Sequence, residues 1–311
     1  PAGVAQRSTV IPSPLPPTET LAITPTAAPT TVHLPPDGSG EYTSLTQAVE
    51  SVTPGSTIIL AEGTYEVSPY LLVTKPITLQ GAGMDKTFIT ASSGLLVADF
   101  HETDRVTLTG ITFRHTGAEP ADIVVITDGT ITINDCRFTG GIFQDSEEVI
   151  PIGTGLLVNG QTNGVIANSV FDENGYIGLL ISGDSTVRID SNAISRNDSA
   201  GLGVGDNYRG EITLNNITEN TLHGLAVMED ASPVITSNSI TGNAASGIAF
   251  FDNASGKVST NEISANGNDG ISLADEARPL IDSNNLNGNT WSGISYLGSA
   301  AGTARGNTCD N

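Results

Sequence analysis

The sequence has few basic residues and no long apolar run. Its 311 residues include 12 Lys and Arg against 34 Asp and Glu, which gives a formal net charge of −22 at pH 7. Nucleic acids and anionic membrane surfaces are recognised by basic patches, so neither is an expected partner. A polyuronate chain would also be repelled, unless bound Ca²⁺ bridged the like charges. Because no run of 18 apolar residues occurs, we expect no membrane insertion.

Cysteine is scarce as well, with only Cys136 and Cys309 in the chain. Two cysteines do not make a disulfide framework. The repeat described below separates them by several coils, roughly 30 Å at a strand spacing of about 4.8 Å, which excludes an intrachain disulfide. We expect two buried thiols, with a bond from Cys309 to another chain as the alternative. The chain begins at Pro1 without a signal-peptide pattern, so we expect a processed protein that is secreted, extracellular or on the cell surface.

A repeat of 23 residues dominates the C-terminal half of the sequence, over residues 155–311. Seven glycines keep this spacing, and each opens a phrase of the form Gly-apolar-x-apolar: Gly155, Gly178, Gly201, Gly224, Gly247, Gly270 and Gly293. A fixed period with short strands between turn residues is typical of a stacked solenoid. Apolar residues of successive repeats are then expected to stack inside, since side chains alternate inward and outward along a strand.

Two asparagine columns follow the same period. The first contains Asn192, Asn215, Asn238, Asn261, Asn284 and Asn307, and the second contains Asn174, Asn197, Asn220, Asn243, Asn266 and Asn289. Asparagine tolerates the left-handed backbone of a turn, and its amide can hydrogen-bond to the next amide of a ladder. We therefore predict structural asparagine ladders at two turns of each coil.

The N-terminal part divides into an arm and a capped start of the solenoid. Residues 1–36 are rich in Pro and Thr and are expected to form an extended arm or linker. Residues 37–311 are expected to form the solenoid, with a capping helix at about residues 43–53, where Leu45, Ala48, Val49 and Val52 share one face and Pro54-Gly55 follows.

The entry phrase SLTQAVESVTPGSTIILAEGTY (44–65), the following KPITLQGAG (75–83) and the 23-residue phrase together resemble the pectin-lyase-like superfamily of right-handed parallel β-helices. The resemblance is to bacterial proteins with NosD-like or generic parallel β-helix repeats, and it covers roughly residues 37–311. It implies an all-β fold, a single-stranded right-handed parallel β-helix. The superfamily contains polysaccharide lyases, hydrolases and epimerases as well as noncatalytic surface proteins, so fold does not settle function.

No catalytic motif of those enzymes is found in the sequence. A pectate-lyase-like site implies an exposed basic residue beside Ca²⁺-binding aspartates, and an alginate-epimerase-like site implies an Asp-Pro-His-Glu phrase. The nearest element is Leu222-His223-Gly224, without paired aspartates. On the expected second strand, Arg188 and Glu211 lie one coil apart and are expected to form an ordinary exposed ion pair. No catalytic residue is therefore assigned.

The outward positions of the first strand carry no charge and form a smooth face of small and apolar residues. Its larger members are Leu157, Leu180, Ala226, Met228, Ala249, Phe251 and Leu297. General acid–base catalysis needs titratable groups, so this face is expected to pack against protein. The following turn carries acids that are weak candidates for Ca²⁺: Asp184, Asp206, Glu229, Asp252 and Asp275. Because Asp is also an ordinary turn former, no cofactor is expected, and Ca²⁺ is the alternative.

The leading hypothesis is a noncatalytic extracellular structural protein that assembles into a filament or surface layer. No cap is recognisable after the last repeat, so its strand edges are expected to be open, and the arm could add to a neighbouring copy by a heterologous contact. The proposed arm residues lie in two β-branched stretches: Ser8, Thr9, Val10 and Ile11, and then Leu21 and Ile23. The alternative is a polysaccharide-binding or polysaccharide-modifying β-helix, and the second alternative is a surface adhesin on a Pro/Thr stalk.

Overall fold

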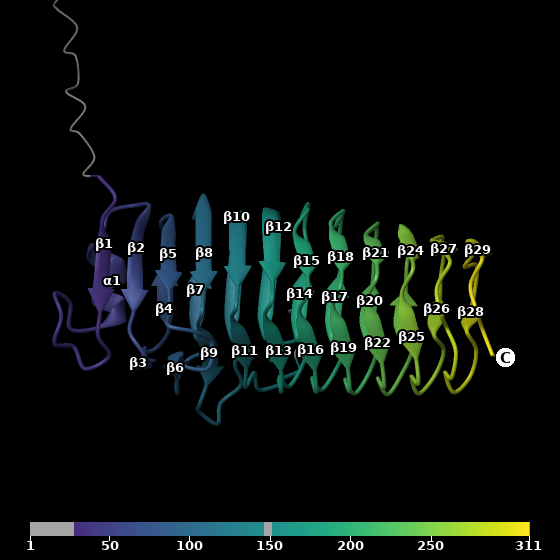
Figure 1. The fold of residues 1–311 in the computed structure, drawn as a ribbon, viewed down its shortest axis with the longest axis horizontal. Helices are drawn as coiled ribbons and strands as arrows, with labels where there is room; N and C mark the ends of the chain where they lie inside the picture. The colour runs from purple at the N-terminus through teal and green to yellow at the C-terminus, as the bar shows by residue number, and fades with distance from the viewer. Residues whose placement is uncertain (1–27, 146–150, 311) are drawn as a thin grey trace, which may run out of the picture.

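A computed structural model describes residues 28–145 and 151–310 of the chain (Figure 1). The coils stack along one axis into a solenoid of about 12 turns. The predicted fold class, an all-β right-handed parallel β-helix with 23-residue coils, is confirmed. The six proposed arm residues, at positions 8–11, 21 and 23, lie outside the described residues.

Each complete coil supplies three strand positions, which stack in parallel with their equivalents in the neighbouring coils. The first-strand stack consists of β4 (Leu71–Val73), β7 (Ala98–Phe100), the start of β10 (Val124–Asn134), the start of β12 (Leu156–Ala167), β14 (Leu179–Ile181), β17 (Leu202–Val204), β20 (Leu225–Val227), β23 (Ile248–Phe250), β26 (Ile271–Leu273) and β28 (Ile294–Tyr296). The second-strand stack consists of β1 (Thr31–Leu34), β2 (Ser56–Leu60), β5 (Ile77–Gln80), β8 (Arg105–Thr109), the ends of β10 and β12, β15 (Arg188–Asp190), β18 (Glu211–Thr213), β21 (Val234–Thr236), β24 (Lys257–Ser259), β27 (Leu280–Asp282) and β29 (Thr303–Arg305).

The third strands form a separate nine-stranded sheet along the lower edge of Figure 1. Its members are β3 (Gly63–Glu66), β6 (Thr87–Ala91), β9 (Thr112–His115), β11 (Arg137–Thr139), β13 (Val170–Asp172), β16 (Ala193–Ser195), β19 (Asn216–Thr218), β22 (Ser239–Thr241) and β25 (Glu262–Ser264). This sheet and the two other stacks enclose one continuous apolar core that runs from Val32 to Leu286.

Inward side chains stack on the equivalent side chain one coil away. In the third-strand sheet, Phe113, Phe138 and Phe171 form an aromatic stack with ring centroids 5.5 and 5.0 Å apart. Register continues this column into Ile194 and Ile217, both fully buried. Stacked rings and branched side chains gain dispersion contacts beyond the area that they bury, so each coil stabilises the next.

The asparagine columns form buried ladders. Asn215 donates from Nδ2 to Oδ1 of Asn238 at 3.0 Å and to the carbonyl oxygen of Ile189 at 2.9 Å. The left-handed backbone that we attributed to these asparagines instead occurs at the residue before them, as at Leu214 and Glu219, both with φ of 57°. The preceding residue makes the bend, and the bend directs the asparagine side chain inward to hydrogen-bond with backbone groups.

The solenoid starts before the expected boundary at residue 36. β1 lies within the predicted arm, yet it pairs with β2 from Thr31↔Thr57 to Leu34↔Leu60. Alternating burial of Val32 and Leu34 makes it an ordinary strand, and the Pro-rich composition around it hid this pattern. The helix α1 (Leu45–Ser51) packs Leu45, Ala48 and Val49 against the core, and the Ser44 hydroxyl accepts a hydrogen bond from Gln47 N at its N-terminus.

Both cysteines are free. Cys136 is buried, but Cys309 is exposed, so the expectation of two buried thiols is wrong for Cys309. Cys309 belongs to the last coil, which has no further described coil to cover it. No helix in the described part of the chain is long and apolar enough to cross a bilayer.

Candidate functional site

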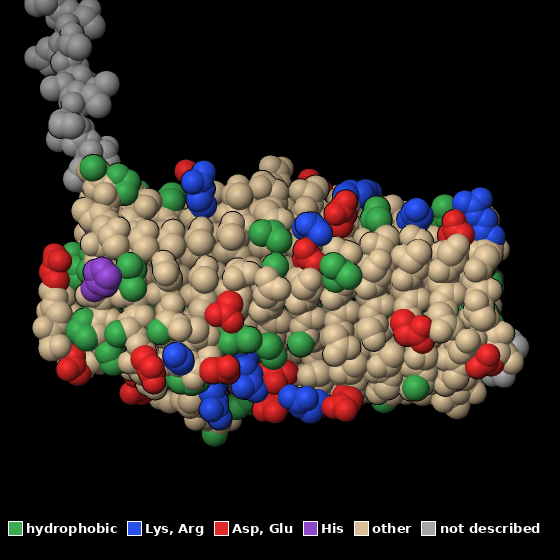
Figure 2. Space-filling model, viewed as in Figure 1, with side chains coloured by type: hydrophobic (Ala, Val, Ile, Leu, Met, Phe, Trp, Pro, Cys, Tyr) green, Lys and Arg blue, Asp and Glu red, His purple; other side chains and the backbone are tan. Residues whose placement is uncertain are grey.

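The outer surface of the third-strand sheet carries a group of arginines, which we call the arginine face. It comprises Arg114 on β9, Arg137 on β11, Asp172 on β13 and Arg196 directly after β16. Basic and acidic side chains gather at the lower edge of the molecule in Figure 2, near the middle of the solenoid. The next strands along the sheet, β19 and β22, carry Asn, Ser and Thr at the same outward positions, so the arginines are confined to a few coils.

Asp172 is the centre of the arginine face. Arg137 donates to it from Nε and Nη2, both at 2.8 Å, and Arg196 donates from Nη2 at 3.0 Å. The Asp172 side chain is only 4% exposed, so this carboxylate is shielded by the two guanidinium groups. The hydrogen bonds to Asp172 raise the pKa of Arg137, which keeps it cationic. Parallel two-point pairing of this kind fixes the arginine geometry.

Arg114 is the free cation of this face. It is exposed, and none of the described residues forms an ion pair or hydrogen bond with its guanidinium. Register places Arg114 beside Thr139, and Thr139 beside Asp172. Arg114 can therefore bind an anionic or hydroxylated ligand without breaking an internal contact.

A small cavity of about 170 Å³ opens between these side chains. Its lining residues are Phe88, Thr112, Arg114, His115, Arg137, Thr139, Gly140 and Glu173. His115 is 4% exposed, and both ring nitrogens are buried without a hydrogen-bond partner in the described structure. Burial lowers the pKa of His115, which favours the neutral imidazole. Glu173 supplies a carboxylate at the cavity edge, 3.6 Å from Arg196.

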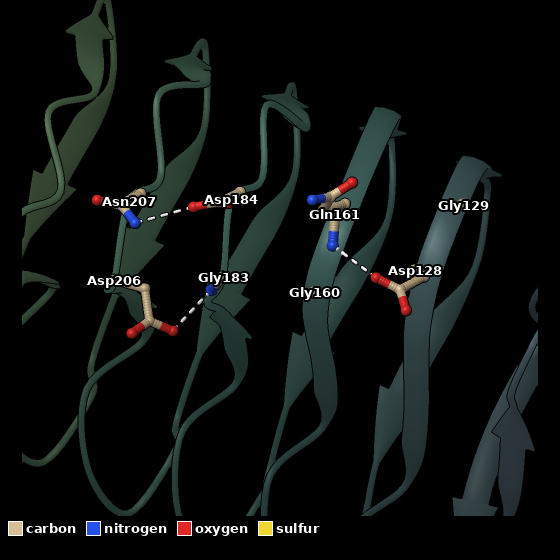
Figure 3. A pocket seen from close by; sticks show the side chains of 8 residues that line it. All are labelled: Asp128, Gly129, Gly160, Gln161, Gly183, Asp184, Asp206 and Asn207. Atoms are coloured by element: carbon tan, nitrogen blue, oxygen red, sulfur yellow. Dashed lines mark hydrogen bonds between the residues drawn. The ribbon is translucent and has the colours of Figure 1, made fainter.

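The acidic turn column is organised by backbone hydrogen bonds. Asp206 accepts one from the Gly183 N–H at 2.7 Å (Figure 3). Glu229 accepts one from the Asp206 N–H. Glu229 N–H donates to Asp252 at 3.0 Å, and Asp252 N–H donates to Asp275 at 3.1 Å. All four acids have φ between 48° and 57°.

The adjacent groove in Figure 3 also contains Asp184, which accepts from Asn207 Nδ2 at 2.8 Å. Within the described ranges, no three His, Cys, Asp or Glu side chains come together as a metal site. Calcium binding by the acidic column stays a prediction, and the backbone hydrogen bonds account for this arrangement without a cation.

The structure brings some residues of the smooth face into contact and leaves others apart. Leu180 and Ala226 join Ile177 and Ala200 in an apolar cluster that is separate from the core. Leu157, Met228 and Phe251 are half-buried against it. Ala249 is fully buried, whereas Leu297 is 59% exposed.

The other polar residues named from the sequence, Arg188, Glu211 and His223, contact neighbouring residues of the solenoid. Arg188 pairs with Asp190 at 3.0 Å and with Glu211 at 3.5 Å on the exposed surface. His223 Nδ1 accepts a hydrogen bond from Ser246 N at 3.3 Å, and its ring stands edge-on to Phe251. Sequence reasoning missed the arginine face, although arginines at outward positions of two successive third strands, Arg114 and Arg137, were a signal for it.

Comparisons with known proteins agree with this architecture. A family model described as "Right handed beta helix region" matches residues 93–243 and 199–311. Comparison with curated proteins gives no match.

Solved structures that resemble the chain include three polysaccharide-modifying enzymes. The mannuronan C-5 epimerase AlgE4 A-module of Azotobacter vinelandii is 18% identical with a TM-score of 0.59, over 83% of this chain and 89% of that one. Pectate lyase Pel9A is 16% identical with a TM-score of 0.52, over 91% and 79%. A variant of the periplasmic alginate epimerase AlgG is 14% identical with a TM-score of 0.55, over 89% and 83%.

These neighbours correct the leading hypothesis drawn from the sequence. The similar structures are epimerases and a lyase, so the prediction of a noncatalytic, self-assembling structural protein is wrong. The argument for assembly used a bare strand edge and a free arm, and neither feature is specific to assembling proteins. The alternative, a β-helix that binds or modifies a polysaccharide, is better supported.

Proposed function

We propose that this chain, a member of the family described as "Right handed beta helix region", binds and modifies a polysaccharide. The polysaccharide is acidic, and it binds at the arginine face. The observation that carries this proposal is the cavity between the free cation Arg114 and the paired Arg137. Guanidinium groups hydrogen-bond to sugar carboxylates in two-point geometry and to hydroxyls. The solved neighbours act on mannuronan, pectate and alginate, which are polymers of acidic sugars.

The net charge of −22 does not prevent such binding. At physiological ionic strength, charges on a surface are screened beyond about 8 Å. The local balance of charge at the arginine face therefore decides whether an anion binds, and none of the described acidic residues pairs with Arg114. Phe88, half-exposed two strands from Arg137, offers an apolar surface to the C–H face of a sugar ring.

The cavity favours proton abstraction over hydrolysis. Glycoside hydrolysis uses two carboxyl groups about 5–9.5 Å apart. Among the described residues that line the cavity, Glu173 is the single carboxylate. Removal of the proton beside a sugar carboxylate needs one base and a cation that stabilises the developing charge. We assign these roles to Glu173 and Arg114. Glu173 takes the proton, and the carbanion then either takes a proton from water on the opposite face of the ring, which gives an epimer, or expels the glycosidic oxygen beta to it, which leaves with a proton from water and gives an unsaturated product. An enzyme of this kind would act outside the cytoplasm, in the extracellular space or the periplasm.

The test uses the whole chain with alginate, polygalacturonate and neutral dextran. Binding is measured by affinity electrophoresis, and modification by the ultraviolet absorbance of unsaturated products and by proton NMR. Arg114→Gln should weaken binding of an acidic polysaccharide about tenfold, because a hydrogen bond to a charged group contributes about 1.5–3 kcal/mol. Arg278→Gln is the matched control, since Arg278 is also exposed and has no ion pair in the described structure.

Glu173→Gln should keep binding and abolish modification. Dextran should bind neither wild type nor variants. Equal losses in Arg114→Gln and Arg278→Gln, or binding of dextran as strong as that of the acidic polymers, would contradict the proposal. So would unchanged products from Glu173→Gln.

A further inference from the structure

A second groove lies on the first-strand stack, away from the third-strand sheet that carries the arginine face. We call it the outer apolar groove. It has a volume of about 400 Å³, and the residues that line it include Ile177, Leu180, Asp206, Met228 and Glu229. This volume lies within the range of about 300–1,000 Å³ that is usual for ligand pockets.

The floor of the groove is an apolar cluster on the outside of the solenoid. Ile177 is 6% exposed and Leu180 is 7% exposed, although both belong to outward-facing or turn positions. Gly203 makes room for them: a Cβ at this position would lie 2.9 Å from Leu180 Cδ1 and 3.7 Å from Met228 Cε. The large side chains therefore lean together over a glycine and form a continuous apolar floor across neighbouring coils.

One rim of the groove is acidic. Asp206 and Glu229 belong to the turn column, and the left-handed backbone of each, with φ of 48° and 57°, holds its carboxylate at the edge. In each carboxylate, one oxygen accepts a backbone N–H of the preceding coil, from Gly183 and from Asp206. No described residue hydrogen-bonds to the second oxygen of either carboxylate, so both oxygens are available to a ligand. The described residues that line the groove include no Lys or Arg.

The apolar floor and the acidic rim together determine which kind of ligand the groove can bind. A polyuronate would meet like charges at the rim, and sugar hydroxyls would lose their water over Ile177, Leu180 and Met228 without gaining partners. An apolar side chain gains by burial on the same floor, and a neighbouring cation gains at the rim.

We propose that the outer apolar groove binds an extended peptide segment of a partner protein in which apolar residues alternate with Lys or Arg. Alternation follows from strand geometry, since successive side chains of an extended peptide point to opposite sides. The apolar side chains lie on Leu180 and Met228, and the basic ones face Asp206 and Glu229. The proposal does not depend on the polysaccharide function, because the two sites share no residue.

The test measures fluorescence anisotropy of a labelled nine-residue peptide that alternates leucine and lysine. Two control peptides replace every lysine by glutamate or every leucine by serine. Wild type should bind the first peptide saturably and neither control. The double variant Asp206→Asn, Glu229→Gln should weaken binding at least about fivefold, while its amide oxygens still accept the backbone N–H groups.

The matched control is the double variant Asp275→Asn, Glu276→Gln, which removes two exposed acids of the same turn column two coils beyond Glu229, about 10 Å away at the spacing of parallel strands. It should change binding less than about twofold, because surface charges are screened over this distance. Circular dichroism verifies that both double variants keep the fold.

The proposal is overturned by equal weakening in the two double variants, which would indicate attraction to the overall negative charge alone. It is also overturned if no saturable binding occurs, or if the serine peptide binds as well as the leucine peptide. Binding that appears only after deletion of residues 1–27 would assign the groove to the chain's own N-terminal segment instead.

Discussion

Arg137 and Asp172 are joined by two hydrogen bonds of 2.8 Å, from Nε to Oδ1 and from Nη2 to Oδ2. The two residues are 35 positions apart in sequence and lie on neighbouring strands, β11 and β13. Arg196, directly after the next strand, adds a third hydrogen bond to the same carboxylate. One shielded carboxylate therefore connects three successive coils beneath the proposed binding surface.

Asp172→Asn should lower the free energy of unfolding by about 2 kcal/mol. Breaking a buried ion pair costs about 3–5 kcal/mol, and the cost is reduced here because both arginines reach solvent. Urea unfolding followed by circular dichroism measures the change. Asp282→Asn removes the carboxylate of the exposed Arg305 pair and should leave stability unchanged. Equal effects of the two substitutions would show that burial of Asp172 contributes nothing.

Asn238→Ala should lower the free energy of unfolding by about 3 kcal/mol. The Asn238 side chain donates to Ile212 O, Thr236 O and Asn261 Oδ1, and its Oδ1 accepts from Asn215. Alanine leaves several buried groups without partners, and each costs about 1–3 kcal/mol, partly offset by relaxation.

Urea unfolding checks this prediction as well, with Asn253→Ala as the control. Asn253 is exposed, and its amide makes one hydrogen bond of 3.2 Å, to Asp230. Its loss should change stability by less than about 0.5 kcal/mol. A similar small change in Asn238→Ala would mean that the ladder amides are replaceable by water.

His115→Leu should reduce the loss of stability in mild acid. Burial places the pKa of His115 in the folded protein below its usual value of 6.5. Between these two pKa values the unfolded chain binds more protons than the folded chain, so the free energy of unfolding falls as pH drops below 6.5. Leucine removes this proton uptake and also removes two buried nitrogens without partners.

Urea midpoints at pH 7.5 and pH 5 measure the effect. His223 keeps part of the acid sensitivity in the variant, since burial lowers its pKa as well. An identical pH dependence in His115→Leu and wild type would refute this assignment.

The two thiols should differ in reactivity. Cys309 is exposed and should react with a maleimide in the native protein. Burial raises the pKa of Cys136 to about 12, so it should react only after unfolding. Mass spectrometry is expected to show one label on the native chain and two in 6 M guanidinium. Native labelling of Cys136 would indicate that the coil around it opens.

The repeat alone determined the architecture. A residue that recurs every 23 positions meets its own equivalent one coil away, as Asn215 meets Asn238 and Ile194 meets Ile217. Stacking of like on like is therefore readable without coordinates, and it predicted the fold class and the partners within each ladder.

In the upstream coils, neighbouring residues could not be identified from a constant spacing, because insertions change the length of each coil. Thr112 pairs with Arg137, and Arg137 with Val170, at separations of 25 and 33 residues. No constant spacing in the sequence identifies Arg137 and Asp172 as neighbours, or shows that Arg114 has no partner among the residues that the structure describes. The strand β1 was missed because prolines surround it, and its pairing with β2 is visible only once the first coil has closed.

The contacts between equivalent residues of the regular coils were therefore predictable from the sequence. Hydrogen bonding and packing between such positions depend only on the period. The irregular coils place the arginine face, and the leaning of Leu180 and Met228 over Gly203 forms the outer apolar groove. The arginine face depends on diagonal contacts between non-equivalent residues. The groove depends on a large side chain, Leu180, stacking beside a glycine at the equivalent position, and on the diagonal approach of Met228. Only the tertiary structure decides how these side chains fill the space.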